Sequence, residues 1–203
     1  MPSRYLYLVR HGEQQDAEHG LPDGPLSARG VRQAQAVAER LGGVPFSGAW
    51  TSPLQRAQET ASIMTERLPA LEPQPSALLM DCIPSGPTPD LPHVFEPFFG
   101  GVTAEQIAAG EAQMSDALAE WMTPPSSGGD RHDLLITHNF VIGWFVREVM
   151  QAPSWQWMSL NQANCGLTIL RRRSGKPPQL VVHNDLGHLP AEDRTGLPIP
   201  QPY

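Results

Sequence analysis

Two histidines of this 203-residue chain each come at the end of an apolar run that favours β-structure. His11 is the centre of an Arg-His-Gly triplet that closes residues 5–12, and His138 directly follows residues 134–137. A guanidinium binds two oxygens of an oxyanion through its fork, and a neutral imidazole can attack phosphorus. These residue types indicate phosphate chemistry. For the first motif taken alone, a chance triplet at a plain strand end is the alternative.

The two apolar runs predict buried strands of a mainly parallel sheet, because such strands are covered on both faces. In open α/β sheets, ligands bind outside the carboxyl ends of the strands. We therefore expect Arg10, His11 and His138 to lie where a substrate would bind. Gly12 allows a sharp backbone turn and the close approach of a ligand at the same edge.

A further cation lies at the start of a predicted helix. Ser52 suits the N-cap and Pro53 suits the first helical position, and the helix is expected to end near Leu68, ahead of Pro69. Arg56 then occupies the first turn, where the helix dipole disfavours a positive charge. A bound anion would offset that cost, whereas the alternative is an arginine solvated on the surface.

Helical and strand patterns alternate along the rest of the chain. Ser27 is a good N-cap for a helix that Gly42 and Gly43 end, and Thr103 with Gln106 forms a capping-box pattern. The predicted elements are a helix over 27–41, strands at 48–51 and 77–80, a helix from 103 to 121 or 122, a strand at 133–137, a helix at 139–150, and strands at 165–171 and 179–183. Residues 186–203 are expected to form an extended tail.

Composition limits the class of protein. With 40% hydrophobic residues, the chain can form one α/β domain over 1–203 with its own core. The formal net charge of −7 argues against a nucleic-acid or anionic-membrane partner, and no apolar stretch reaches about 18 residues. Cys82 and Cys165 form neither a metal-ligand pattern nor a disulfide framework, which favours a reducing compartment. Because no signal-peptide pattern precedes the first strand, we expect a cytoplasmic protein.

Three motifs together resemble a known family. The triplet at His11, a Ser-Pro-x-x-Arg-Ala-x-x-Thr run around Arg56, and His138 after its apolar strand follow one another in order. Over residues 8–170 the chain resembles the histidine phosphatase superfamily, also called the phosphoglycerate-mutase-like fold. The resemblance implies a three-layer αβα sandwich with a mostly parallel central sheet. It implies that His11 is the nucleophile that becomes phosphohistidine. It also implies a phosphate pocket completed by Arg10, Arg56 and His138, without a metal or another cofactor.

The general acid is expected in a segment that departs slightly from the family pattern. Residues 79–84 resemble the Leu-x-Glu-Gly-x-Pro segment of the protein-phosphatase-like branch, with Asp81 at the place of the glutamate and Cys82 at that of the glycine. A general acid must reach the leaving group, and aspartate is one methylene shorter than glutamate. We expect Asp81 to be the acid, with Glu13 as the alternative donor. A turn-forming role before the proline-rich loop is the other interpretation of Asp81.

A second departure lies six residues after the nucleophile. Ala17 stands where classical mutases have an asparagine that helps to hold phosphate, and Gln14 or Gln15 is a candidate substitute. The amide of Asn139, at the start of a helix, is expected to add a donor to the phosphate pocket. Five further histidines match none of the motifs and are expected to be loop or strand residues: His19, His93, His132, His183 and His188.

The segment expected to cover the site is free of cations. Between Arg67 and Arg131 the sequence has no Lys or Arg, and in the family the region corresponding to residues 81–130 lies over the active site as a lid. A lid without a cation is poorly suited to a second phosphate or a carboxylate, which argues against bisphosphoglycerate and phytate-like substrates. Aromatic residues in the lid suggest an apolar or neutral organic moiety or a peptide, or else are core residues: Phe95, Phe98 and Phe99.

The sequence therefore predicts a phosphomonoester phosphatase that acts through phosphohistidine on a small monophosphate or a phosphoprotein. Phosphoglycerate mutase is the alternative enzyme, and the short chain and the cation-free lid argue against it. A non-catalytic module that binds phosphate or a phosphopeptide is the alternative outside enzymes. The sequence leaves the oligomeric state open.

Overall fold

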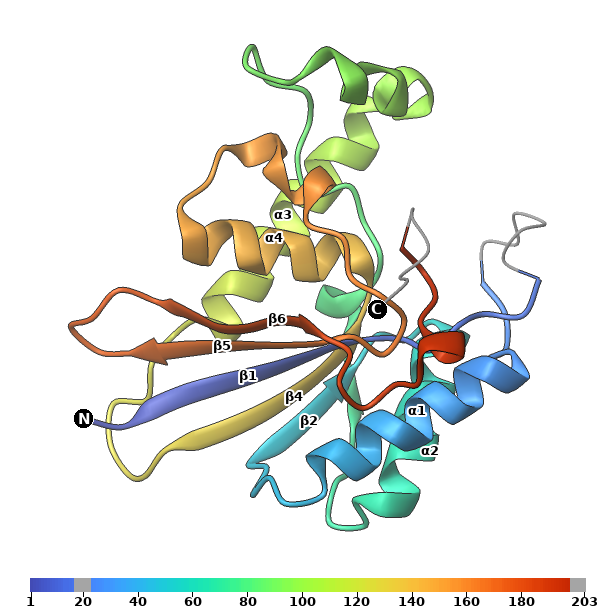
Figure 1. The fold of residues 1–203 in the computed structure, drawn as a ribbon. Coiled ribbons are helices and arrows are strands. Elements are labelled where there is room, and N and C mark those ends of the chain that lie inside the picture. The colour runs from blue at the N-terminus through green and yellow to red at the C-terminus, as the bar shows by residue number, and fades with distance from the viewer. Residues whose placement is uncertain (17–22, 198–203) are drawn as a thin grey trace.

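The fold is built on one six-stranded sheet with helices on both faces (Figure 1). The computed structural model describes residues 1–16 and 23–197. The strands are β1 (Ser3–Arg10), β2 (Gly48–Thr51), β3 (Gln74–Pro75), β4 (Arg131–Thr137), β5 (Leu167–Arg173) and β6 (Gln179–Asp185). The α-helices are α1 (Ala28–Leu41), α2 (Gln55–Arg67), α3 (Ala104–Trp121) and α4 (Asn139–Met150). The 3-10 helices are η2 (Ala77–Leu79), η3 (His93–Gly101), η4 (Ser154–Ser159) and η5 (Ala191–Asp193).

Parallel pairing at the centre of the sheet places both histidine motifs. The strand order is β3-β2-β4-β1-β5-β6, in which the first four strands are parallel and the last two are antiparallel to their neighbours. In the β1–β4 pair, Arg10 lies opposite Thr137, and the backbone N–H of His11 donates to the Thr137 carbonyl oxygen (2.9 Å). His11 and His138 therefore leave the sheet at the same edge, and the predicted mostly parallel sheet is confirmed.

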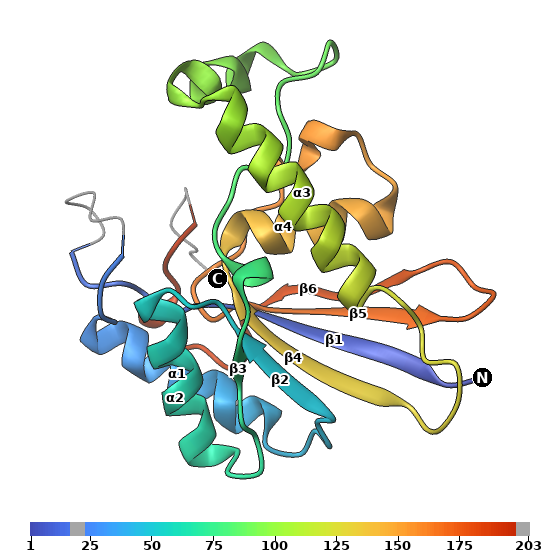
Figure 2. The ribbon, with the colours of Figure 1, turned by 180° about the vertical axis from the view of Figure 1, so that it is seen from behind.

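The three predicted layers are also confirmed. Helices α1 and α2 cover one face of the sheet, and α3 and α4 cover the other (Figures 1 and 2). Successive side chains of β1 point to opposite faces of the sheet. Tyr7 and Val9 pack with α1 and α2. Leu6 and Leu8 pack with α3 and α4. A strand covered on both faces needs an unbroken apolar run, which is the pattern that the sequence displays.

Local capping signals locate most helix boundaries. The Ser27 hydroxyl accepts from the backbone N–H of Gly30 and starts α1. Thr103 and Gln106 form both hydrogen bonds of the capping box at the start of α3. The predicted spans of β2 and α4 agree with the structure. Those of β4 and β6 differ by two residues at one end, and that of β5 is shifted by two residues at both ends.

One predicted strand and one predicted helix cap are wrong. Residues 77–79 form the 3-10 turn η2 instead of a strand, and the short edge strand lies earlier, at β3. The amide of Gln113 on α3 donates to the carbonyl oxygens of Leu78 (3.2 Å) and Met80 (2.8 Å), so these groups bond to a helix and not to a strand ladder. Helix α2 begins at Gln55 instead of Pro53, and Ser52 does not provide its N-cap.

The expectation of an extended tail is also wrong for residues 186–197. This part contains η5 and folds back onto α1, where Gln33 donates to the backbone carbonyl of Asp193 (2.7 Å) and to the Thr195 hydroxyl (2.8 Å). Partners of this kind come from distant parts of the chain, so local sequence does not reveal them. Residues 198–203 lie outside the described part of the chain.

The expected lid region is divided between two structural roles. Helix α3 belongs to the layer over the sheet, while η3 projects beyond the layer, at the top of Figure 1. The η3 phenylalanines pack on other aromatic rings: Phe98 lies edge-on to Phe140 and Trp157, with ring centroids 5.6 and 5.8 Å apart. Phe98 nevertheless keeps 37% of its surface exposed, which places it at the margin of the core. In the described part of the chain, no helix combines the length and apolarity needed to cross a bilayer.

Helix α3 passes close to the segment that carries Asp81, and Gly110 permits that approach. A Cβ at Gly110 would overlap the carbonyl oxygen of Ile83. We expect Gly110→Ala to lower the free energy of unfolding by about 1–3 kcal/mol, as overpacking does, although alanine favours helix. Urea denaturation measures the change, with Gly43→Ala as the control because a Cβ there would meet nothing within 4 Å. Equal losses in the two variants would contradict this close packing.

Candidate active site

Arg56 on α2 contacts both His11 and His138, which follow the parallel strands β1 and β4. Its Nε donates to Nε2 of His11 (3.1 Å), and its Nη2 contacts Nδ1 of His138 (3.2 Å). The two imidazole rings lie 5.1 Å apart between centroids. All three side chains are buried. The sequence motifs had singled out all three residues, although His11 lies 45 positions before Arg56 and His138 lies 82 positions after it. The structure brings them together.

Hydrogen bonds define the tautomers of both imidazoles. Nδ1 of His11 lies 2.7 Å from the carbonyl oxygen of Gly12, an acceptor, so Nδ1 carries the proton and Nε2 presents its lone pair. Nδ1 of His138 accepts from Arg56, so the proton of this ring lies on Nε2, which donates to the Ser52 hydroxyl (2.8 Å). Ser52 therefore orients His138. The sequence had placed Ser52 at a helix cap, although it belongs to the run around Arg56.

Both histidines are held neutral by their surroundings. Burial lowers the pKa of His11 well below its usual range, and the positive charge of Arg10 lowers it further. Burial likewise lowers the pKa of His138, with contributions from Arg56 and Arg10. A neutral imidazole is the form that can attack phosphorus, and the Nε2 lone pair of His11, which accepts from Arg56, becomes available once that guanidinium turns to a phosphoryl oxygen.

The turn after His11 fits against α1 and α2 at very short range. A Cβ on Gly12 would lie 2.7 Å from the carbonyl oxygen of Gly30, so only glycine suits this position. The Gly12 backbone N–H donates to the Thr60 hydroxyl (2.9 Å), which itself donates to the carbonyl oxygen of Arg56 (2.7 Å). Thr60, the last residue of the run around Arg56, thus ties the nucleophile turn to the helix that carries this arginine.

Arg10 is held by two backbone carbonyl groups. Its Nη1 donates to the carbonyl oxygens of Gln162 (2.6 Å) and Gly196 (2.8 Å). Its Nε is buried and has no hydrogen-bond partner within the described ranges. Burial lowers the pKa of Arg10 to about 10, so the guanidinium remains charged at neutral pH. Neither carbonyl could be assigned from the sequence, because backbone groups carry no residue-type signal.

Asp81 lies at the edge of this cationic cluster. Its Oδ2 is 3.7 Å from Nη2 of Arg56, and 41% of its side chain is exposed. Burial of the remainder raises the pKa of Asp81, against the opposing attraction of Arg56 and Arg10. A carboxyl with a raised pKa beside the nucleophile cluster has the position and the chemistry of a proton donor.

Glu13, the alternative donor, is committed elsewhere. Its carboxylate accepts from the Ser27 hydroxyl (2.7 Å) and from Nη1 of Arg29 (3.2 Å). Burial alone would raise the pKa of Glu13, but hydrogen bonds from Ser27, Thr195 and Arg29 outweigh it and lower the pKa. Glu13 is therefore an ionised structural carboxylate, and the geometry favours Asp81 as the donor.

Asp23 is a site residue that the sequence analysis missed. Its Oδ1 accepts from Nη1 of Arg56 (3.1 Å), and its Oδ2 accepts from the backbone N–H of Gln55 (2.8 Å). This carboxylate supplies a negative charge at the start of α2, which offsets the cost of a cation in the first turn. Arg56 was expected to face an anion, and the Asp23 carboxylate is such an anion within the protein itself.

The remaining candidates contribute less to the cluster. The Asn139 side chain bonds to the loop that follows η4, donating to Asn161 (3.2 Å) and accepting from the Gln162 backbone (2.7 Å). Gln14 is buried and Gln15 is exposed, and Ala17 and His19 lie outside the described residues. The other histidines bond away from His11, to the following partners: His93 to Glu96, His132 to Tyr7, His183 to Gln162 and His188 to Cys165.

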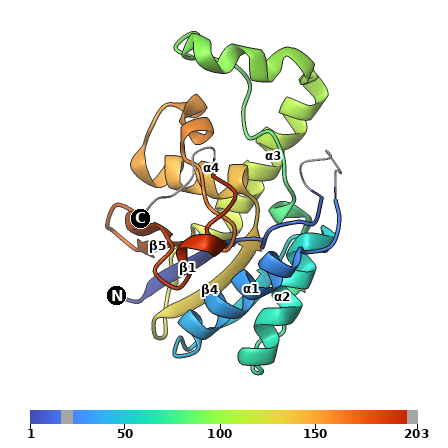
Figure 3. The same ribbon diagram turned by 45° about the vertical axis from the view of Figure 1, so that its right-hand side comes forward.

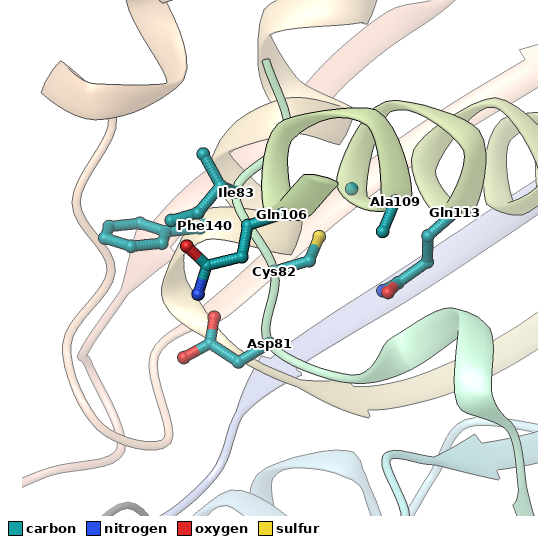
Figure 4. Close-up of a pocket in the computed structure, with 8 residues that line it drawn as sticks. Asp81, Cys82, Ile83, Gln106, Ala109, Gln113 and Phe140 are labelled. Carbon is teal, nitrogen blue, oxygen red and sulfur yellow. The ribbon is translucent and has the colours of Figure 1, made fainter. Parts of the chain in front are cut away.

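A pocket of about 400 Å³ opens beside Asp81 (Figure 4). It is lined by Asp81, Cys82, Ile83, Gln106, Ala109, Gly110, Gln113 and Phe140. Burial raises the pKa of the Cys82 thiol to about 12, so this thiol stays protonated and behaves as a small apolar group. In Figure 4 the amide of Gln106 points toward the carboxyl of Asp81. Within the described ranges, no group of three or more His, Cys, Asp or Glu side chains could hold a metal ion.

Comparison with known sequences links this chain to phosphate-transfer proteins. The sequence profile of the histidine phosphatase superfamily (branch 1) matches residues 6–83. Probable phosphoglycerate mutase GpmB of Escherichia fergusonii is 30% identical over 180 residues, covering 80% of this chain and 82% of the relative. The mitochondrial serine/threonine-protein phosphatase Pgam5 of Caenorhabditis briggsae is 29% identical over 195 residues, or 92% of this chain. This chain spans only 65% of the length of that Pgam5.

Solved structures share the αβα architecture. YhfR of Bacillus stearothermophilus has a TM-score of 0.70 to this chain at 22% identity, over 91% of this chain and 98% of its own. The alpha-ribazole phosphatase from Shigella flexneri has a TM-score of 0.69 at 21% identity, over 89% of this chain and 96% of its own. The likeness extends well beyond the span matched by the sequence profile, so it confirms the predicted fold.

The lowered pKa values of the two histidines make stability depend on pH. In the folded protein both rings stay neutral, whereas the unfolded chain protonates them below about pH 6.5. Because the unfolded state binds more protons, each histidine removes about 1.4 kcal/mol of unfolding free energy per pH unit below that value. Between about pH 7.5 and 5.5, we expect His138→Asn to lose less stability than the wild type. Urea denaturation at both pH values tests this, and equal losses would contradict it.

Proposed function

Because the chain belongs to the histidine phosphatase superfamily, we propose that it hydrolyses phosphomonoesters through a phosphohistidine formed at His11. The observation that carries the proposal is the geometry at His11: Nδ1–H is bound to Gly12, and the lone pair of Nε2 faces Arg56 at 3.1 Å. The nucleophilic atom therefore lies against a group that binds phosphoryl oxygens.

In the proposed first step, the phosphoryl oxygens bind to the guanidinium groups of Arg10 and Arg56, which stabilise the charge of the transition state. His138 joins them by exchanging the bond of its Nε2–H to the Ser52 hydroxyl for one to a phosphoryl oxygen. Nε2 of His11 attacks phosphorus, so that a P–N bond forms while the bond from phosphorus to the ester oxygen breaks. The electron pair of the broken bond leaves on that oxygen, which takes the proton of the Asp81 carboxyl. The raised pKa of Asp81 increases the protonated fraction of this donor.

In the second step, water attacks the phosphoryl group and its proton passes to the Asp81 carboxylate. The P–N bond breaks, which returns the electron pair to Nε2 of His11 and releases inorganic phosphate. Hydrogen bonding of Nδ1 to Gly12 holds the ring in place through both steps (2.7 Å). The site needs no further protein group for the proton balance.

The leaving group of the proposed substrate is uncharged. Apart from Asp81, the lining of this pocket consists of apolar and amide side chains, and within the described ranges no Lys or Arg belongs to it. A carboxylate or second phosphate bound there would lack a counter-charge. This favours hydrolysis of a small monophosphate with a neutral organic moiety, or of a phosphoprotein side chain, over a phosphoglycerate mutase reaction.

We also propose a cytoplasmic location and no nucleic-acid or membrane partner. The net charge of −7 and the unpaired state of both cysteines support this part of the proposal.

Hydrolysis of p-nitrophenyl phosphate in the presence of EDTA tests the reaction. We expect His11→Ala to reduce kcat by at least ~10³-fold because the nucleophile is lost, and Asp81→Asn to reduce it by about 10²–10⁴-fold because the proton donor is lost. Rapid acid-free quenching should detect phosphohistidine in the wild type and not in His11→Ala. His93→Ala, an exposed position on η3, is the control. Wild-type vanadate binding without any turnover would favour the binding module instead.

Two aryl phosphates test the neutral pocket. The wild type is expected to prefer phenyl phosphate to 4-carboxyphenyl phosphate by about 10-fold or more in kcat/KM, since the carboxylate finds no cation. Ala109→Arg should reduce this preference by about 10-fold because it places a guanidinium in the lining. Ala108→Arg is the matched control, as Ala108 is also exposed on α3 but does not line the pocket. Equal wild-type rates on both esters would contradict a neutral pocket and leave the reaction itself unaffected.

A further inference from the structure

We propose that Thr195 and Gly196, in the segment after β6, position the nucleophile turn and Arg10 and so form part of the phosphate site. The inference rests on the proposed function, because it concerns the binding of a phosphoryl group at that site. Neither residue belongs to a motif that the sequence displays, and both come more than 180 positions after Arg10.

The segment is fixed on α1 before it reaches the site. Asp193 is buried, and both of its carboxylate oxygens accept hydrogen bonds from the guanidinium of Arg32. Figure 3 shows η5, which ends at Asp193, lying beside α1. The direction of the chain beyond Asp193 is therefore set by a two-bond ion pair between a buried carboxylate and the largely exposed guanidinium of Arg32.

Thr195 then connects two buried amides that flank the nucleophile. Gln33 accepts from the backbone N–H of Glu13 (2.8 Å) and donates to the Thr195 hydroxyl (2.8 Å). Asn164 donates to the carbonyl oxygen of His11 (3.1 Å), and its backbone N–H donates to the carbonyl oxygen of Thr195 (2.9 Å). The carbonyl of His11 and the N–H of Glu13, on either side of Gly12, are thus both linked through these two amides to Thr195.

Gly196 provides the contact to Arg10. Its carbonyl oxygen accepts from Nη1 of Arg10 (2.8 Å), opposite the carbonyl of Gln162. Its φ of +84° lies in the region that favours glycine. A Cβ at this position would overlap Oδ1 of Asn164 and lie 2.7 Å from Nη1 of Arg10. The backbone conformation that directs the Gly196 carbonyl toward Arg10 therefore leaves no room for a side chain at position 196.

These bonds select one orientation of the Arg10 guanidinium. Two carbonyl oxygens bound to the same nitrogen fix the plane of the group, and their partial negative charge compensates its burial. Without the Gly196 carbonyl the guanidinium can rotate about its long side chain, at an entropic cost when phosphate binds. Loss of the contact should thus weaken the binding of a phosphate-like anion more than it weakens the fold.

Gly196→Ala tests the contact, with Gly128→Ala as the matched control. Gly128 has nearly the same φ, +86°, but a Cβ there would meet nothing within 4 Å. Both alanines carry the same backbone cost, so any difference between them comes from the contacts of Gly196. We expect the inhibition constant for orthovanadate, and KM for p-nitrophenyl phosphate, to rise by about 10-fold in Gly196→Ala and by less than about 2-fold in Gly128→Ala. Thermal unfolding records the stability of each variant.

Thr195→Val supplies a second variant with a different readout. It removes the hydroxyl that joins Gln33 to Asn164 while it keeps the shape of the side chain. We expect a reduction in kcat of about 5-fold or more, because the His11 turn loses its support.

Three outcomes separate the possible failures. Unchanged vanadate inhibition in Gly196→Ala and unchanged kcat in Thr195→Val, with the wild type active, would overturn the positioning role alone. Equal changes in Gly196→Ala and Gly128→Ala would also overturn it, since backbone strain would then account for the effect. A wild type that neither turns over p-nitrophenyl phosphate nor binds vanadate would overturn the proposed function, and the positioning role with it.

Discussion

The parallel pairing of β1 with β4 is the constraint on which the rest of the site depends. It aligns Arg10 with Thr137, so that the next residue of each strand, His11 and His138, leaves the sheet at one edge. Arg56 then reaches this edge from α2 and bonds to both rings. A shift of register between the strands would separate the histidines by several ångströms and leave Arg56 with one partner. The buried apolar faces of β1 hold that register.

Charge balance is the second constraint, because two guanidinium groups are gathered in a mostly buried place. Asp23 and Asp81 both face Arg56, and backbone carbonyls face Arg10. Part of the balance is therefore made by carboxylates and part by neutral dipoles. Burial keeps His11 and His138 neutral, and the nearby guanidinium charges reinforce this, so the features that would attract a phosphate dianion also support a nucleophilic imidazole.

Segments outside the sheet edge adapt this centre to a particular ester. Gly110 and Gln113 of α3 fix the course of residues 78–83 and so determine where the Asp81 carboxyl lies. The pocket that this carboxyl helps to line has no Lys or Arg among the described residues. On the opposite side, the segment after β6 reaches Arg10. The Asp81 carboxyl and the Arg10 guanidinium are thus each held in place by chain that lies far from the histidine motifs in sequence.

The sequence by itself indicated a mainly parallel sheet and singled out His11, His138 and Arg56, because apolar periodicity, capping residues and short motifs are local signals. It placed Ser27 and Thr103 at helix starts for the same reason. The three layers followed from the family resemblance that the short motifs carry. The role of Ser52, the Asp23 contact and the Gly196 carbonyl were decided only by the tertiary structure. Each depends on a partner more than 30 positions away, and the last on a backbone group that every residue possesses. Residues 77–80 form a short apolar run that is compatible with a strand, but two of their carbonyl groups bond to the Gln113 side chain of α3, a distant partner, and the segment turns instead.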